Sequence, residues 1–503
     1  MRAGQPAIEP LAPVPPPSPS RTAGRAEGVA PFLGFVALAA ILAAAVVVPT
    51  DADYAPALIV PAAIAGGIAV AARPDFAVVG LLILTGFQGT ILLYTPLPGR
   101  AFVDFILAAL WVGSVWATLN YKNRPVWLLP GVVALGVYAV ISGLGAVFSE
   151  NPGDGISSLH LSVWLMAATF LIGLAPWTSA TYWNIAKGAL VVAILVGLYA
   201  LYRTITGPAD AERELALRGK PGFLALKTSG SLPSAGHLAS WCTAFVPFAL
   251  ALSLSMTGRW RWVAVGAFGL SLFAVLATEV RTGIVAAGAG ALLVLVLIGA
   301  TRAFPGPVKA TRVAITVAGA LLLGTGAYIT TIGTSDESSA RFERILNPED
   351  DFAFSTRLVR WEEAFEVMSE NPFGQGLGTL GAVAADKPID PDLTRQLDSS
   401  YIKVGVEQGP WVLAFFVIAL LLLLINLCWR SITTLDPARA ALGIAGAGVL
   451  LGVSVSFYAN TYIEEPQILA GWLLVGLGVA QFSRPPESPE PTSGDESENP
   501  ARA

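Results

Sequence analysis

The chain has 503 residues, of which 54% are hydrophobic and only 13% charged, with a mean hydropathy of +0.65. Such a composition excludes an ordinary soluble domain. The net charge of −5 comes partly from the two tails and gives no indication of nucleic-acid binding. We therefore expect no nucleic-acid partner.

The two ends are polar and differ from the rest of the chain. Residues 1–30 are rich in proline and lack the short apolar core of a signal peptide, and residues 484–503 are rich in Pro, Ser and Glu. Both are predicted to be disordered cytoplasmic tails. Because Cys242 and Cys428 both fall in predicted spans, neither a structural disulfide nor a metal cluster is expected.

Apolar runs of roughly 20 residues, the length that crosses a bilayer, recur throughout residues 31–483. Lipid cannot satisfy backbone polar groups, so uninterrupted runs of this length predict helices. The expected fold is all-α: a polytopic membrane protein with about 12–14 transmembrane helices and a large external loop that contains short helices. The predicted spans are residues 31–49, 55–72, 76–95, 101–119, 126–148, 158–176, 182–202, 237–256, 262–280, 283–301, 312–331, 410–429, 437–457 and 465–482.

Lysine and arginine in the short loops predict the orientation. One set of alternate loops is rich in these residues, whereas the opposite short loops together hold only Arg100. The positive-inside rule then places both termini in the cytoplasm. The two long loops, residues 203–236 and 332–408, are predicted to be external.

The first long loop carries two candidate residues. Arg218 precedes the segment 230–239 that opens the next span, and loops of this length are usually solvated, so a structural role is the alternative to ligand binding. His237 opens the next span and is the external histidine candidate. A hydrogen-bonded structural histidine is the alternative to a base.

Arg281 lies at the predicted external junction between two hydrophobic spans. A charge so close to hydrocarbon is costly unless it is paired or reaches water or headgroups. It could snorkel to lipid phosphate or pair with Glu279. It could instead clamp a phosphate ligand, because guanidinium offers bidentate hydrogen bonds to phosphate oxygens.

An amphipathic helix is predicted from Ser355 to Glu370, capped by Ser355 or Thr356 and stopped by Asn371-Pro372. Its predicted apolar stripe consists of Leu358, Trp361, Phe365 and Met368. Arg357 lies on the edge of that stripe and Arg360 further toward solvent. The helix is expected on the membrane surface or on the bundle, where its arginines either bind lipid headgroups or meet an anionic ligand.

A glycine-rich segment and two acids complete the second long loop. Gly376 lies in Gly-Gln-Gly-Leu-Gly, which permits either a tight turn or close approach to a ligand, and no P-loop lysine accompanies it. Asp398 near a membrane entrance could act as a general base or remain a solvated carboxylate. Glu407 is a second acid further along the same element.

Four segments, in this order, resemble the O-antigen ligase and O-antigen polymerase superfamily. Residues 230–239 resemble a family segment entering a helix, with His237 where asparagine is usual, and 278–283 resemble its Ser-Arg-Gly segment. Residues 357–378 resemble its Arg, Trp, Pro and glycine run. Residues 398–409 resemble the segment ending the large external loop, with Tyr401 and Glu407 matching its tyrosine and glutamate.

The resemblance implies a metal-independent membrane glycosyltransferase without a cofactor, in the bacterial cytoplasmic (inner) membrane. Its partners would be an undecaprenyl-diphosphate-linked glycan donor, a glycan or lipid acceptor, and membrane lipids. Arg281 and Arg357 would stabilise the leaving pyrophosphate, and Asp398 occupies the position where ligases have a catalytic histidine. That departure favours a polymerase or another transferase of the superfamily. The remaining substrate-binding candidates are Arg218, Arg360, His237, Gly376, Tyr401 and Glu407.

Two other classes remain open from the sequence. A lipid-linked oligosaccharide flippase or polysaccharide exporter would also suit a chain with this many helices, but it should place ionisable groups near the bilayer midplane. A structural membrane protein would tolerate the loss of Arg281 and Arg357.

Overall fold

The computed structural model describes residues 73–94, 99–120, 128–217, 228–304, 313–314, 318–319, 352–384, 399–458 and 462–484. These residues form helices joined by turns, with no strand among them. Eight helical segments are long and apolar enough to cross a membrane, one of them Pro152–Leu174, and three shorter helices are also apolar. The protein is therefore an all-α polytopic membrane protein, as predicted. The predicted spans at 31–49 and 55–72, and most of that at 312–331, fall outside the described residues.

The described helices, in chain order, are α3 (Pro74–Gly86), α4 (Gln88–Tyr94), α5 (Gly99–Asn120), α6 (Pro130–Val147), α7 (Pro152–Met166), α8 (Ala168–Leu174), α9 (Ser179–Thr206), α10 (Asp210–Leu217), α11 (Ala235–Ser255), α12 (Gly258–Ala277), α13 (Arg281–Ala300), α16 (Phe352–Glu370), α17 (Ser400–Gln408), α18 (Pro410–Thr433), α19 (Pro437–Ser456), the 3-10 helix η3 (Tyr462–Glu464) and α20 (Ile468–Phe482).

Two predicted spans are interrupted. The span at 76–95 is divided at Phe87 into α3 and α4, where the backbone of Gly89 lies so close to the 229–234 turn that a Cβ would come within 2.7 Å of the Pro233 nitrogen. The span at 158–176 begins earlier, at Pro152, because proline at the first helical position starts a helix readily. It is divided at Ala167 into α7 and α8.

Helix α11 forms the centre of the bundle, and 94% of an apolar stretch of 18 residues in this helix is buried. It packs against α12, α13 and α19. Small residues allow these helices to approach closely: a Cβ on Gly283 would lie 2.6 Å from that of Ala239, and one on Gly290 would lie 2.6 Å from the carbonyl oxygen of Gly448. Glycine and alanine at crossings are typical of helix packing in membranes.

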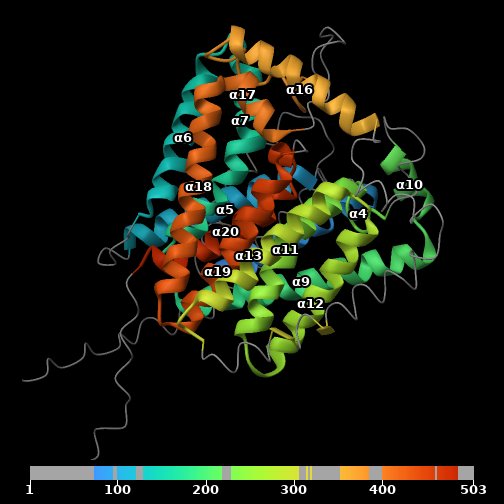
Figure 1. Cartoon of the computed structure of the whole chain (residues 1–503), viewed down its shortest axis with the longest axis vertical. Coiled ribbons are helices and arrows are strands. Elements are labelled where there is room, and N and C mark those ends of the chain that lie inside the picture. The colour runs from blue at the N-terminus through green and yellow to red at the C-terminus, as the bar shows by residue number, and fades with distance from the viewer. Residues whose placement is uncertain are drawn as a thin grey trace, which may run out of the picture.

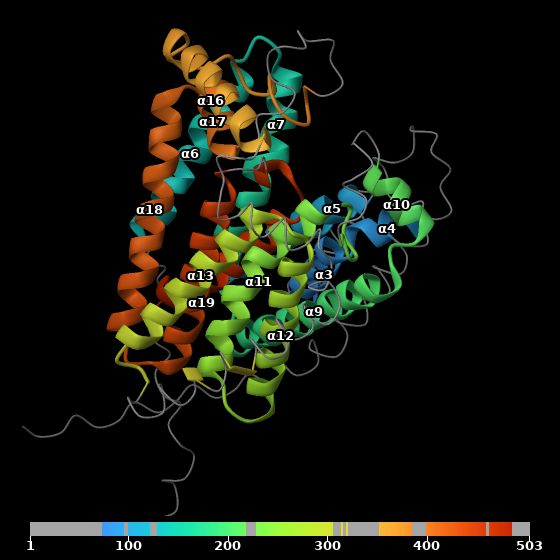
Figure 2. The ribbon, with the colours of Figure 1, turned by 45° about the vertical axis from the view of Figure 1, so that its right-hand side comes forward.

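Helices α6 and α18 lie side by side, and α16 lies across the end of the molecule at which α18 begins (Figures 1 and 2). Helix α17 lies beneath α16 and continues into α18 through Gly409, which has a φ of +92° and is followed by Pro410. Trp411, in the first turn of α18, is 73% exposed. Aromatic residues at such positions mark the boundary between membrane and water.

Candidate functional site

The glycine-rich turn after α16 is attached to the end of α17 by backbone hydrogen bonds. The amide of Gln375 donates to the Val406 carbonyl at 2.8 Å, and the amide of Gly376 donates to the Glu407 carbonyl at 2.9 Å. Gly374 has a φ of +81°, and a Cβ there would collide with the Glu407 carbonyl. The turn therefore needs glycine for its backbone conformation and its close approach to α17.

A buried cluster of one lysine and two glutamates holds the next part of this turn. Lys403 Nζ lies 2.6 Å from Glu407 Oε1 and 3.0 Å from Glu464 Oε1, and it donates to the Leu380 carbonyl at 2.9 Å. Glu407 Oε1 accepts from the amides of Gly378 and Leu380, both at 3.0 Å. All three charged side chains are at most 4% exposed. They join α17, η3 and the glycine-rich turn into one unit.

Burial raises the pKa of Glu407, while Lys403 and the Leu380 amide act in the opposite direction. Its Oε1 accepts three hydrogen bonds at once, and the carboxyl group is only 2% exposed. Glu407 can therefore organise the turn, but in this conformation it presents no oxygen to a substrate.

The turn between α19 and α20 connects this cluster to His237. Glu464 Oε2 accepts from the amide of Ala382 at 3.0 Å, while the adjacent Glu465 lies against the start of α11. Glu465 Oε2 is 3.1 Å from His237 Nε2, and His237 Nδ1 is 2.8 Å from Ser234 Oγ. Two consecutive acids thus bind two separate parts of the site.

Arg281 is the first residue of α13, and three residues separate it from the end of α12 at Ala277. Its side chain is half-buried. The packing of Gly283 on Ala239 brings the first turn of α13 against the first turn of α11, which also carries His237. Arg281 and His237 therefore start neighbouring helices at the same end of the bundle.

Arg357 lies within α16, on the face that packs onto the bundle. The buried residues in the described part of this helix are Trp361, Ala364 and Met368. The ring of Trp361 packs edge-to-face on that of Tyr458, with 4.8 Å between the ring centroids. Arg357 precedes Trp361 by four residues and so continues the same face, as a half-buried residue. Arg360 is also half-buried.

The predicted details of this helix need two corrections. It begins at Phe352, so Ser355 and Thr356 lie inside it and do not cap it. Leu358 and Phe365 are 46% and 58% exposed, so they do not belong to the buried stripe. At about 100° per residue, the buried face is rotated by about 50° from the predicted one, toward Arg357.

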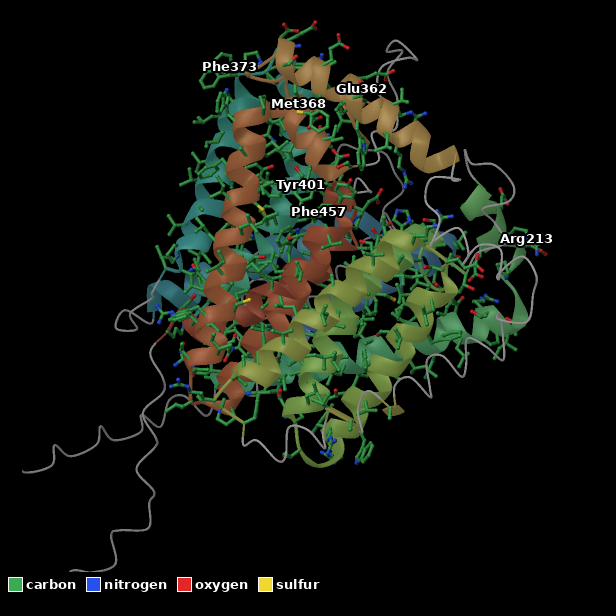
Figure 3. The ribbon with its side chains drawn as sticks, viewed as in Figure 1. Arg213, Glu362, Met368, Phe373, Tyr401 and Phe457 are labelled. Carbon is green, nitrogen blue, oxygen red and sulfur yellow. The ribbon has the colours of Figure 1, made fainter. Side chains whose placement is uncertain are left out.

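Tyr401 lies in α17 between α16 and the bundle core (Figure 3). Its hydroxyl donates to the Ser454 carbonyl at 2.8 Å, and its ring centroid is 6.0 Å from that of Phe457. Burial raises the pKa of Tyr401 to about 12, so the phenol stays protonated at neutral pH. Its polar atom is engaged with α19.

Two predicted site residues, Arg218 and Asp398, lie outside the described residues. Asp398 directly precedes Ser399, whose hydroxyl caps α17 by accepting from the amide of Ile402 at 3.4 Å. The amide of Ser400 donates to the Phe457 carbonyl at 2.9 Å. The segment that follows Asp398 is therefore fixed to the end of α19.

The sequence did not single out four residues that the structure brings into the site: Ser234, Lys403, Glu464 and Glu465. The spacing of Lys403 and Glu407, four residues apart in an apolar helix, was the available signal for the first contact. Among the described residues, no group of three or more His, Cys, Asp or Glu side chains could hold a metal ion.

Comparison with known proteins is consistent with this arrangement. No curated protein matches the chain. The segment from 266 to 417 runs from within α12, through Arg281 and Arg357, to the first turns of α18. This segment matches the family model described as O-antigen ligase, which confirms the resemblance of the chain to the O-antigen ligase and polymerase superfamily.

Proposed function

We propose that this protein is a membrane glycosyltransferase that transfers a glycan from an undecaprenyl-diphosphate-linked donor to a sugar hydroxyl at the outer face of the cytoplasmic membrane. The reaction would serve the assembly of a cell-surface or exported polysaccharide. The family match over residues 266–417 supports glycan transfer in polysaccharide assembly.

The observation that carries the proposal is the way this matched segment folds. It contains the start of α13 with Arg281, and it contains α16 with Arg357 on the face that packs over α17. The glycine-rich turn between α16 and α17 is fixed by hydrogen bonds to α17 and to Glu464 of η3. An arginine-bearing helix is thereby held over the end of a membrane bundle, where the diphosphate of a lipid carrier would lie.

In the proposed reaction the acceptor oxygen attacks the anomeric carbon of the donor glycan. The bond from that carbon to the phosphate oxygen breaks, and the lipid diphosphate leaves with the bonding electrons. Arg281 and Arg357, with Arg218 from the other long loop, would bind the diphosphate and stabilise the charge that develops on it. Asp398 and His237 are the candidates for the group that takes the proton of the acceptor hydroxyl, because Glu407 presents no oxygen to a substrate.

A deletion strain tests the proposal. Loss of the protein should leave a glycan on its lipid carrier, and the wild-type gene should restore the finished polysaccharide. A single repeat on the carrier would identify a polymerase, and a full-length polymer on the carrier a ligase. Carrier-linked glycan confined to the cytoplasmic face would instead indicate a flippase or exporter and would overturn the proposal.

Complementation with Arg281→Ala and Arg357→Ala tests the pyrophosphate clamp. Each variant should reach the membrane and still reduce polysaccharide by about 10²-fold or more, because stabilisation of a developing charge is typically worth that much. The matched control is Arg213→Ala, which removes an exposed arginine of α10 (Figure 3) and should restore normal polysaccharide. Normal product from both clamp variants would exclude the clamp.

A further inference from the structure

Ser234, His237 and Glu465 form a continuous hydrogen-bonded chain of side chains. His237 is the third residue of α11, and its Nδ1 lies 2.8 Å from the hydroxyl of Ser234, the residue that caps the helix. On the other side of the ring, Nε2 lies 3.1 Å from Glu465 Oε2, from the turn before α20. Two elements more than 200 residues apart in sequence, 234–237 and 465, supply the chain.

The chemistry of the three groups determines which of them donates and which accepts in each of these two hydrogen bonds. Glu465 is 40% exposed, and a carboxylate can only accept a hydrogen bond. The neutral imidazole of His237 therefore carries its proton on Nε2, which donates to Glu465. Nδ1 then carries a lone pair and accepts from the Ser234 hydroxyl. The same serine oxygen accepts from the His237 amide at 3.4 Å and keeps a further lone pair.

Resting on the transfer reaction proposed above, we propose that His237 is its proton acceptor, reached through Ser234 and supported by Glu465. As the acceptor oxygen bonds to the anomeric carbon, its proton passes to Ser234 Oγ, and the serine passes its own proton to His237 Nδ1. The imidazolium that forms lies against the Glu465 carboxylate, which stabilises it. The proton leaves to solvent after the lipid diphosphate has departed, and the neutral histidine is restored.

The buried acid Glu407 is less suited to this role. Glu407 is 2% exposed and its Oε1 accepts three hydrogen bonds. The side chain of His237, by contrast, is 18% exposed, and it contacts Ser234, a residue that is itself only half-buried. A proton from a substrate hydroxyl can reach this serine without unfolding the turn.

A second observation concerns the turn that carries Glu465. Gln467, two residues after Glu465, donates from Nε2 to Gln88 Oε1 at 2.8 Å. Its own Oε1 is buried and accepts no hydrogen bond from any described residue. A buried acceptor left unpaired costs about 1–3 kcal/mol, so a water molecule or a ligand hydroxyl would be favourable there.

The experiment uses purified full-length protein and the carrier-linked glycan that accumulates in the deletion strain. His237→Gln should lower kcat by about 10²–10³-fold and change KM by less than about threefold, because proton transfer contributes to the chemical step and little to binding. Glu465→Gln should lower kcat by about 10-fold or more, and because Glu465 is partly exposed, this variant should fold normally.

The pH profile separates a proton acceptor from a merely structural histidine. The wild-type enzyme should lose kcat on the acidic side as the acceptor becomes protonated, and this acidic limb should disappear in His237→Gln. The ionisable side chain in contact with His237 is Glu465, and Arg281 begins the helix packed beside α11. Glu465→Gln should keep the acidic limb, because His237 remains the proton acceptor.

Two control substitutions correspond to the changes at His237 and Ser234. His160→Gln removes the other histidine–carboxylate pair, in which Nε2 is also 3.1 Å from its partner, Asp104 Oδ1. Thr178→Ala removes a side-chain cap from α9, as Ser234→Ala does from α11. Both controls should keep wild-type kcat, whereas Ser234→Ala should lower it by about 10-fold or more.

A His237→Gln enzyme with wild-type kcat and an unchanged acidic limb would overturn the relay while leaving the transfer reaction intact. An equal loss in His160→Gln would also overturn it, because the effect would not depend on this chain. If the deletion strain has an unchanged glycan profile and the wild-type enzyme transfers nothing, the proposed function fails and the relay fails with it. Asp398→Asn identifies the competing base if it alone abolishes turnover.

Discussion

Lys403 Nζ lies 2.6 Å from Glu407 Oε1 in the interior of the protein, and both residues are 2% exposed. The lysine also lies 3.0 Å from Glu464. One lysine and two glutamate side chains therefore share a buried site. Such a cluster is stable only while its partners remain complete, since an unpaired buried charge is expensive.

Lys403→Met should therefore destabilise the protein strongly, by about 3–5 kcal/mol, because it leaves Glu407 and Glu464 together without a cation. Thermal unfolding of purified protein in detergent measures this change. The glycine-rich turn should also become sensitive to limited proteolysis, because the lysine no longer holds the Leu380 carbonyl.

The double variant Lys403→Met with Glu407→Gln is the matched control. It removes one negative charge together with the positive one, so it should recover part of the lost stability. Equal stability of Lys403→Met and the wild-type protein would show that the cluster does not hold the turn.

A second prediction concerns the glycine at the start of this turn. Gly374→Ala places a Cβ at a φ of +81° and against the Glu407 carbonyl. The positive φ alone costs about 1–2 kcal/mol for a residue with a side chain, and the contact adds to it. We expect a lower unfolding temperature and weaker protection of the Gln375 and Gly376 amides from hydrogen exchange, because both bind the end of α17.

Gly143→Ala, in the middle of α6, is the comparison for this substitution. A Cβ there meets nothing within 4 Å, and alanine is a better helix former by roughly 1 kcal/mol. This variant should be at least as stable as the wild type. If both alanine variants behaved alike, the turn would not depend on the glycine backbone.

Much of the membrane architecture could be predicted because long apolar runs leave few alternatives to spanning helices. The helix at 352–370 was also recognisable, since Asn371-Pro372 ends it. Its buried face was predicted only in part, because Trp361 and Met368 are buried as expected but the other two predicted residues are not. Leu358 and Phe365 are apolar yet exposed, because in a membrane protein apolar side chains can face lipid or the interface as well as the core.

The contacts of the site could not be predicted in the same way. Glu464 binds the amide of Ala382, 82 residues earlier in the chain, and Glu465 binds His237 at a still larger separation. Periodicity reports which face of one helix is apolar, but it carries no information on which two helix ends meet. The role of Lys403 in the buried cluster could not be predicted for the same reason, because its second partner, Glu464, comes from a distant turn.

The last prediction concerns how Arg357 is held in place. Trp361 anchors α16 through its contact with Tyr458 and is 7% exposed, and Arg357 lies one helical turn before it. Trp361→Ala removes this anchor and leaves a cavity between α16 and the bundle. Because a displacement of about 1 Å can cost 10²-fold in rate, polysaccharide formation should fall by about 10-fold or more although Arg357 itself is intact.

Phe365→Ala distinguishes lost positioning from a general effect of shortening an aromatic residue in α16. Phe365 lies one turn further along the same helix but is 58% exposed, so its removal should leave both activity and stability close to wild type. If Trp361 acts by positioning Arg357, the double variant Trp361→Ala with Arg357→Ala should be no less active than Arg357→Ala alone. Both changes would then remove the same interaction. Additive losses would show that Trp361 acts independently of the arginine.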